Sequence, residues 1–107
     1  MAYIAMNRFR VLPGQEETFE TIWRERESRL GEMPGFVEFR MLKGPERDGV
    51  RLYISHATWA TEEDFRGWLT STQFRGSHKN AGRSRMDGVI DGPPDFEGFE
   101  TVLHQTA

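Results

Sequence analysis

The chain has 107 residues, of which 36% are hydrophobic, 29% charged and 12% aromatic, which is the composition of a soluble globular protein. Its length is close to that of one domain, so we expect a single domain over residues 1–107. The net charge is −3 with both signs mixed, which argues against nucleic acid as a partner, because phosphate binding needs a concentrated basic face. No apolar run approaches the roughly 18–20 residues that span a bilayer. We therefore expect no membrane partner and a cytoplasmic location.

Residues 2–12 alternate with the period of two that is typical of a strand, and Pro13-Gly14 ends it. One face of this strand carries, in order, Tyr3, Ala5, Asn7, Phe9 and Val11. Asn7 is the only amide in that row, and an amide on an inward face must find hydrogen-bond partners or cost about 1–3 kcal/mol. The simpler interpretation is an Asn that caps a backbone group or faces solvent at an edge. A functional role is the alternative.

Residues 15–30 place apolar side chains at helical spacing, which predicts a helix that Gly31 closes. Two strands follow at 35–43 and 50–59, joined by a hairpin connection over 44–49. In the first of them we expect Phe36 on the face opposite Phe39. In the second, alternation separates Leu52, Ile54 and His56 from Tyr53, Ser55 and Trp59, and His56 is interpreted as a surface or edge residue.

A second helix begins after Thr61, which is the N-cap of a capping box completed by Asp64. Its apolar stripe contains Phe65, Trp68 and Leu69. Residues 70–72 are poor helix formers, so we expect a break and then a short helix that carries His78. In one straight helix, residues ten apart lie about 15 Å apart along the axis, so a break allows Trp68 and His78 to converge on one pocket.

A loop rich in Gly, Pro and Asp is expected over 83–95, and a last strand over 96–104. The order β-α-β-β-α-(α)-β predicts an α+β, ferredoxin-like fold with helices on one face of an antiparallel sheet. We expect the other face, with Tyr53 and Trp59 among its residues, to be covered in a homodimer, because large apolar patches are rarely left exposed.

Several kinds of site are excluded by the residues themselves. The chain has no cysteine, which rules out disulfides, thiolate metal sites and thiolate-ligated haem. No His, Asp and Glu spacing supplies a closed zinc site, and there is no nucleophile elbow or phosphate-binding glycine loop. Haem held by one proximal imidazole needs only His78. Apolar walls for haem are available from Phe65, Trp68 and Phe74, and cations for its propionates from Lys79, Arg83 and Arg85. A structural role for Trp68 and a surface role for His78 are the alternatives.

Three segments resemble the bacterial haem-degrading monooxygenases of the iron-regulated surface determinant type, within the antibiotic-biosynthesis monooxygenase-like, dimeric α+β barrel superfamily. They are residues 4–9 (IAMNRF), 59–68 (WATEEDFRGW) and 74–79 (FRGSHK). The likeness covers nearly the whole chain in element order. Its specific part is the combination of Asn7, Trp68 and His78, which corresponds to the catalytic trio of the haem-degrading branch.

This resemblance implies that haem is both cofactor and substrate. His78 would be the axial ligand of the haem iron, Asn7 would hydrogen-bond the oxygen on the opposite side, and Trp68 would press the porphyrin out of plane. With O2 and electrons from a reductase or reductant, the macrocycle would open to a bilin-type tetrapyrrole and release iron. The fold implied is a homodimeric α+β barrel.

Two other functions stay open at this point. Relatives in the superfamily resemble quinol or antibiotic-biosynthesis monooxygenases that oxidise aromatic substrates without a cofactor, and they would use Asn7, Trp68 and His78 as polar and stacking groups. A non-catalytic haem-binding module is the other alternative.

Overall fold

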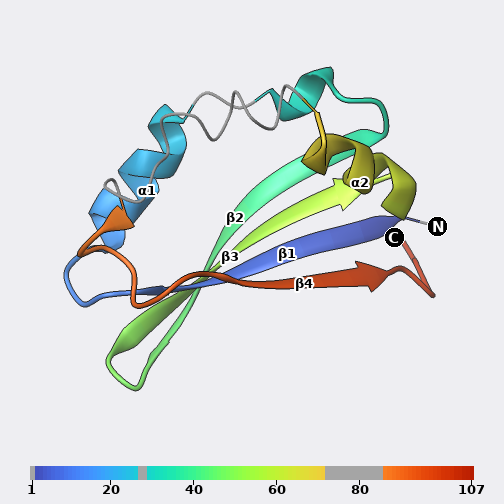
Figure 1. The fold of residues 1–107 in the computed structure, drawn as a ribbon. Coiled ribbons are helices and arrows are strands. Elements are labelled where there is room, and N and C mark those ends of the chain that lie inside the picture. Colours follow the sequence, from blue (N-terminus) through green and yellow to red (C-terminus); the bar gives the residue numbers. More distant parts are fainter. Residues whose placement is uncertain (1, 27–28, 72–85) are drawn as a thin grey trace.

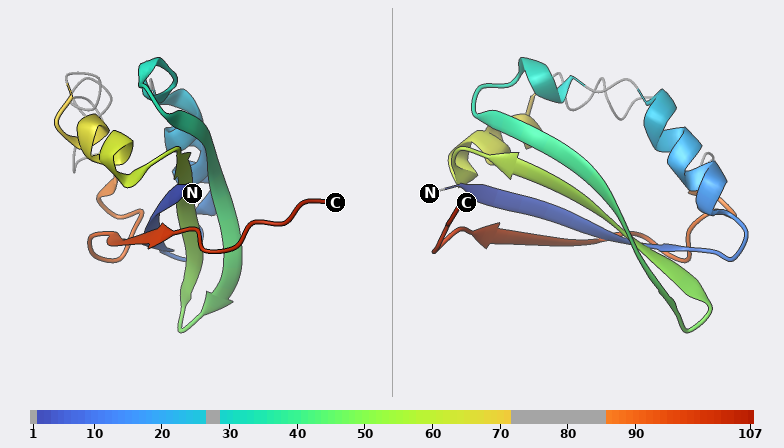
Figure 2. Two further views of the ribbon diagram at one scale, coloured as in Figure 1. Left: turned by 90° about the vertical axis from the view of Figure 1, so that its right-hand side faces the viewer. Right: turned by 180° about the vertical axis from the view of Figure 1, so that it is seen from behind.

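The computed structural model describes residues 2–26, 29–71 and 86–107. Its elements are β1 (Tyr3–Val11), α1 (Glu16–Glu25), the 3-10 turn η1 (Leu30–Glu32), β2 (Phe36–Arg47), β3 (Val50–Trp59), α2 (Glu62–Leu69) and β4 (Asp95–Glu100). The strands form one antiparallel sheet in the order β2-β3-β1-β4. Both helices lie over the same face of this sheet (Figures 1 and 2). The predicted α+β, ferredoxin-like order is confirmed in the described part of the chain.

The core lies on the helix-facing side of the sheet and has two parts. The first, which we call the α1 cluster, contains Phe9, Val11, Phe19, Ile22, Tyr53 and Val89. The second, the α2 cluster, contains Tyr3, Ala5, Trp59, Phe65 and Trp68. Strand β1 runs beneath both, so one strand supplies side chains to each cluster and only Asn7 separates them on this face.

The expectation that Tyr53 and Trp59 lie on the uncovered face is wrong. Tyr53 is 1% exposed and Trp59 is fully buried, and both belong to the core under the helices. Alternation along β3 correctly separates the two sets of side chains, but it does not say which set the helices cover. Helix packing decides that, and it buries the larger aromatic rings because they remove the most apolar surface from water.

Strand β2 contains an irregularity that the sequence pattern does not reveal. Its pairing with β3 shifts between Phe36 and Glu38, which leaves Val37 as the extra residue of a bulge. The bulge places Phe36 on the helix-facing side, with its ring centroid 5.5 Å from that of Trp59. The expected position of Phe36 on the face opposite Phe39 is therefore wrong.

The ends of several elements differ from the sequence expectation. Helix α1 ends at Glu25, not near residue 30, because Arg26 is already extended. The hairpin between β2 and β3 needs only Asp48 and Gly49, whose φ values of 54° and 81° suit a tight two-residue turn. Strand β4 ends at Glu100 and not at residue 104.

Helix α2 begins and ends as the sequence predicts. The backbone N–H of Asp64 donates to Thr61 Oγ1 over 3.1 Å, which is the N-cap bond of the expected capping box. The helix ends at Leu69, where the residues that favour a break begin. The short helix expected beyond the break, with Phe74 and His78, lies outside the described residues.

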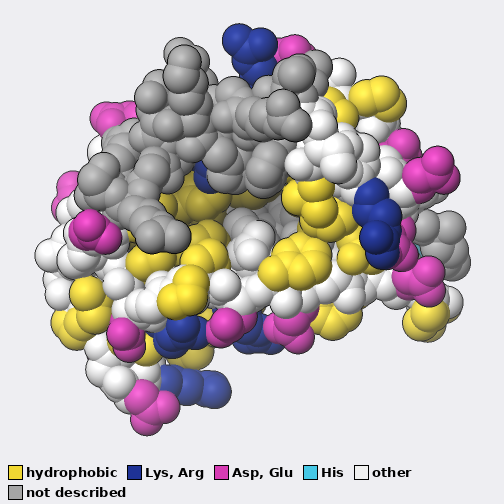
Figure 3. Space-filling model, viewed as in Figure 1, with side chains coloured by type: hydrophobic (Ala, Val, Ile, Leu, Met, Phe, Trp, Pro, Cys, Tyr) yellow, Lys and Arg dark blue, Asp and Glu magenta, His cyan; other side chains and the backbone are white. Residues whose placement is uncertain are grey.

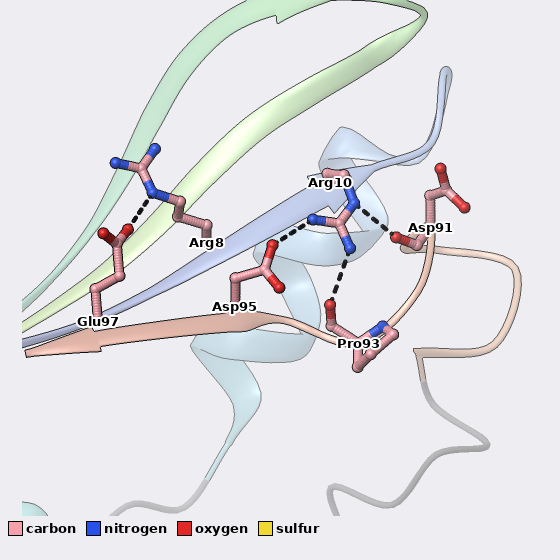
Figure 4. A network of polar contacts seen from close by, with 6 residues as sticks. All are labelled: Arg8, Arg10, Asp91, Pro93, Asp95 and Glu97. Carbon is pink, nitrogen blue, oxygen red and sulfur yellow. Dashed lines mark hydrogen bonds and ion pairs between the residues drawn. The ribbon is translucent and has the colours of Figure 1, made fainter.

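Two arginines of β1 hold β4 against the sheet (Figure 4). Arg8 contacts Glu97 over 2.6 Å, and Arg10 contacts Asp95 over 2.7 Å. Arg10 also donates hydrogen bonds to the backbone carbonyls that precede β4, those of Asp91 and Pro93. Single exposed ion pairs contribute little, but this guanidinium makes three contacts at once. The network thereby fixes the strand that carries Phe96.

Candidate functional site

Asn7 lies at the centre of the helix-facing side of the sheet. Its cross-strand neighbours are Ser55 on β3 and Phe96 on β4, so it is not at a sheet edge. The residue is half-buried, and in the described part of the chain no hydrogen bond engages its side-chain amide. The capping role considered for Asn7 therefore finds no partner among these residues. An unengaged amide at this depth is available to a ligand.

An aromatic wall stands beside Asn7 on the α2 side. The rings of Phe65 and Phe96 stack with centroids 5.5 Å apart and an angle of only 4° between their planes. Phe65 is buried, whereas Phe96 is 50% exposed. Because Phe96 pairs with Asn7 across the sheet, the exposed part of this stack lies next to the amide.

Phe96 was not among the residues that the sequence singled out. Its position beside Asn7 depends on the pairing of β4 with β1, two segments almost ninety residues apart, and no local pattern reports that pairing. A weak signal existed in the strand composition around residue 96, which predicted a strand but not its neighbour.

Trp68 is part of the α2 cluster and is 6% exposed. Its ring centroid lies 6.3 Å from that of Trp59, with 33° between the planes. The structural role considered for Trp68 from the sequence is therefore real: this indole anchors α2 to the sheet. A contact with a ligand would come in addition, from the small part of the ring that the core leaves uncovered.

A second aromatic surface lies at the end of α1. The rings of Trp23 and Phe39 stack at 5.9 Å, and the guanidinium of Arg26 lies 4.4 Å from the Trp23 centroid. Partial burial lowers the pKa of Arg26 from its usual value. This site offers a cation on a flat aromatic surface. The sequence pattern did not predict this site, because a helix over 15–30 would place Arg26 inside the helix.

The hydrophobic side chains gather over the helix-facing side of the sheet, between the two helices (Figure 3). Asn7 and the stack of Phe65 and Phe96 come from the centre and the β4 side of this region, and Trp23 with Phe39 come from the α1 and β2 side. The arrangement is a polar centre between aromatic surfaces, which suits a flat, largely apolar ligand.

The remaining predicted site residues lie outside the described part of the chain. They are Phe74, His78, Lys79, Arg83 and Arg85. The convergence of His78 with Asn7 and Trp68 therefore stays a prediction. Over 2–26, 29–71 and 86–107, no group of three His, Cys, Asp or Glu residues could hold a metal ion. No helix within these same ranges is long and apolar enough to cross a membrane.

Oxygenases of two kinds are among the known proteins that this chain resembles. A staphylobilin-producing heme oxygenase of Staphylococcus saprophyticus subsp. saprophyticus is 29% identical over 86 residues, which are 79% of this chain and 81% of that protein. The heme degrader MhuD of Mycobacterium tuberculosis, solved with two hemes in its active site, has a TM-score of 0.73 at 22% identity, over 97% of this chain and 99% of that one.

The second kind is represented by SnoaB of Streptomyces nogalater, a cofactor-independent oxygenase. It has a TM-score of 0.64 at 24% identity, over 98% of this chain and 95% of its own. At these identities the two solved structures establish a shared fold only. The family model described as antibiotic biosynthesis monooxygenase matches residues 2–80. This match covers most of the chain, and the protein therefore belongs to the antibiotic biosynthesis monooxygenase family.

Proposed function

We propose that this protein is a haem-degrading monooxygenase, with haem as both substrate and cofactor. The products would be free iron and a bilin-type tetrapyrrole, formed with O2 and electrons from a reductase or reductant. The observation that carries the proposal is the half-buried Asn7 amide, which no hydrogen bond engages in the described chain and which lies beside an exposed aromatic stack. The sequence likeness to a heme oxygenase supports the choice of haem.

The residues present fit a haem group in the chemistry they offer. A porphyrin is a flat apolar ring with a charged edge, and it needs apolar faces, one axial ligand and cations for its propionates. Phe65 and Phe96 offer the apolar surface, and Arg26 offers a cation on the opposite side. His78 would hold the haem iron, Lys79, Arg83 and Arg85 would supply further cations, and Phe74 would form part of the wall. Bound haem would supply the iron that activates O2.

Asn7 has the role of orienting the oxygen substrate. Its side-chain N–H groups can donate to an oxygen atom, and a flat ligand bound against the aromatic rings would exclude water that competes for them. A donor held in place before the reaction needs no reorganisation when charge develops on oxygen. The strand position of Asn7, between β3 and β4, provides that rigidity.

Trp68 would combine two roles. Its burial against Trp59 fixes the indole in the core, and a fixed ring can push against a bound macrocycle without being displaced. We therefore assign to Trp68 the distortion of the porphyrin. Because removing a buried Trp costs about 3–5 kcal/mol of stability, the informative substitution is Trp68→Phe, which keeps most of the apolar volume.

We also propose that the domain, residues 1–107, functions as a homodimer. No described element covers the side of the sheet opposite the helices (Figure 2). Leu42 is 41% exposed and Phe99 is 43% exposed there, and Val102 in the following segment is 87% exposed. Pairing of two such faces would bury this surface. The cytoplasmic location expected from the sequence stays a prediction.

Titration of the purified protein with hemin tests the proposed function. We expect a sharp Soret band that saturates at one haem per chain, and its loss when ascorbate is added in air with catalase present. A Soret band that persists under these conditions would identify a haem-binding module instead. Absence of any Soret band would contradict both haem functions.

The absence of haem binding would favour the second candidate, a cofactor-independent oxygenase acting on polycyclic aromatic substrates. The fold shared with SnoaB and the stack of Phe65 and Phe96 beside Asn7 support this alternative, because a polycyclic aromatic ring system has the same flat apolar faces as a porphyrin. Oxygen uptake with an anthrol or quinol substrate, measured without added metal, would detect this activity.

A further inference from the structure

We propose that Trp68, Trp59 and Tyr3 form a relay that carries oxidising equivalents away from the site to the protein surface. The inference rests on the proposed function for the origin of these equivalents, since an oxygenase that activates O2 produces strong oxidants beside Trp68. The relay itself consists of residues that the structure describes, and it can be tested without haem.

The three residues belong to the α2 cluster, and Trp59 is linked to each of the other two. The centroids of Trp68 and Trp59 are 6.3 Å apart. Trp59 is the direct cross-strand partner of Tyr3 in the ladder of β1 and β3, and both side chains belong to the α2 cluster. Such pairs have Cβ atoms about 4.5–5.5 Å apart. Phe65 packs against both, with centroid distances of 6.1 Å to Trp59 and 5.5 Å to Tyr3. Electron transfer falls steeply with distance. The first step joins rings in contact, and the second joins cross-strand partners whose rings both pack against Phe65.

Tyr3 provides the surface end of this path. Its phenol runs over Gly98 of β4, where a Cβ atom would overlap the hydroxyl group, so the glycine provides the room for it. The side chain reaches an open hollow that is also lined by Thr61, Glu62, Glu100 and Thr101. Burial raises the pKa of Tyr3, as does the nearby Glu62 carboxylate, while Arg66 lowers it. The phenol therefore stays protonated at neutral pH and has carboxylates near it that can accept its proton.

Trp59 has the properties of an intermediate carrier in this relay and not of the residue where the radical finally resides. It is fully buried, and its indole N–H has no hydrogen-bond acceptor among the described residues. An oxidised Trp59 ring therefore has no base among the described residues to take its proton, which disfavours trapping of the charge there. Tyr3 can release its proton to the hollow, so the oxidising equivalent moves on to Tyr3.

The steps balance in electrons and protons. One electron passes from Trp68 to the oxidant, one from Trp59 to Trp68, and one from Tyr3 to Trp59, which restores both indoles. Tyr3 also loses its phenolic proton to water or to a carboxylate in the hollow, and it becomes a neutral phenoxyl radical. One electron and one proton from an external reductant, of the class that serves the proposed reaction, return Tyr3 to its starting state.

Pulse radiolysis of the protein without haem tests the relay directly. An azide radical takes one electron from the Trp68 indole, which is 6% exposed, and this gives azide and an indolyl radical; any N–H proton released to water is taken up again when the indole is reduced. A Trp23→Phe background leaves only Trp59 and Trp68 as indoles, because the chain has three Trp residues. We expect the indolyl absorption to decay as the phenoxyl absorption grows, at a rate independent of protein concentration.

The chain has two tyrosines, which provides a matched pair of variants. Adding Tyr3→Phe should slow formation of the phenoxyl radical about tenfold or more, which corresponds to an added barrier of about 1.4 kcal/mol or more. Adding Tyr53→Phe should leave the rate unchanged, because Tyr53 lies in the α1 cluster. Both changes keep the ring. Equal rates in the Tyr3→Phe and parent proteins, or a rate proportional to protein concentration, would overturn the relay.

A second measurement separates failure of the relay from failure of the proposed function. Haem-loaded protein is treated with ascorbate in air, and the peptide that contains Trp68 is analysed for added oxygen by mass spectrometry. With the relay, Tyr3→Phe accumulates several times more oxidised Trp68 than Tyr53→Phe. Equal oxidation in these two variants during haem loss would contradict the relay. If no haem is degraded, the proposed function fails, and the radiolysis result alone decides the relay.

Discussion

The two aromatic clusters of this protein are built from similar residues on one sheet but end in different ways. In the α1 cluster, the Tyr53 hydroxyl donates to Glu20 Oε2 over 2.6 Å, and Glu20 is also paired with Arg24. This polar lid closes the cluster. In the α2 cluster, Phe65 continues outward to Phe96, which is 50% exposed, and Tyr3 reaches a surface hollow. The α1 cluster is therefore a scaffold, and the more open α2 cluster borders the candidate site.

The largest expected effect is the loss of stability when the α1 cluster loses a buried ring. Phe19 is fully buried, and Phe19→Ala should lower the free energy of unfolding by about 3–5 kcal/mol. Haem bound per folded molecule should stay unchanged, since Phe19 belongs to the scaffold. Denaturant unfolding and hemin titration below the transition measure the two quantities. A selective loss of haem binding in the folded fraction would contradict the assignment of the α1 cluster to the scaffold.

The hydrogen bond from Tyr53 to Glu20 in the same cluster makes a smaller, pH-dependent contribution to stability. The hydrogen bond from Tyr53 is the largest cause that lowers the pKa of Glu20. Tyr53→Phe should cost about 1.5–3 kcal/mol at neutral pH, because the bond is made to a charged group. A lowered pKa in the folded state means that this stabilisation is present above the unfolded Glu value and is lost as pH falls through the folded one.

The stability difference between wild type and Tyr53→Phe should therefore shrink as the solution is acidified below about pH 4.5, the reference value for Glu20. Denaturant unfolding at a series of pH values measures this difference. A difference that stays constant, or grows, on acidification would contradict the assignment of Glu20 as the charged acceptor.

Phe96, which extends the α2 cluster outward, should show the reverse of the Phe19 result: a small loss of stability and a clear loss of haem affinity. Phe96→Ala removes a half-exposed ring, so the loss of stability should stay below about 1 kcal/mol. Haem affinity should fall about tenfold, equivalent to about 1.4 kcal/mol, because the wall beside Asn7 is lost. Phe99→Ala is the matched control: this Phe is 43% exposed on the same strand but on the opposite face. Equal affinities in the two variants would remove Phe96 from the site.

Local signals predicted those features that local physics determines. The N-cap of α2 depends on Thr61 and Asp64 alone, three residues apart, and the expected capping bond is present. The strand predicted over residues 2–12 followed from alternation and corresponds to β1 (Tyr3–Val11), and the break after Leu69 followed from poor helix formers. Each of these features needs no knowledge of distant segments.

Features that depend on how distant segments meet could not be predicted. The bulge that turns Phe36 inward is set by pairing with β3, and the burial of Trp59 is set by which face the helices cover. Phe96 becomes a neighbour of Asn7 only when β4 pairs with β1. The amide at Asn7 was predicted as an exception in an apolar row, but whether a described residue hydrogen-bonds to it depends on how distant segments meet.

The most direct test of the central claim is the rate of Soret loss in Asn7→Ala, measured with ascorbate in air and with catalase present. We expect haem to bind at the same stoichiometry while the first-order rate falls about a hundredfold, the scale for one lost preorganised donor. Ser55→Ala, at the neighbouring cross-strand position, should retain a rate close to wild type. An Asn7→Ala protein that degrades haem at the normal rate would contradict the account.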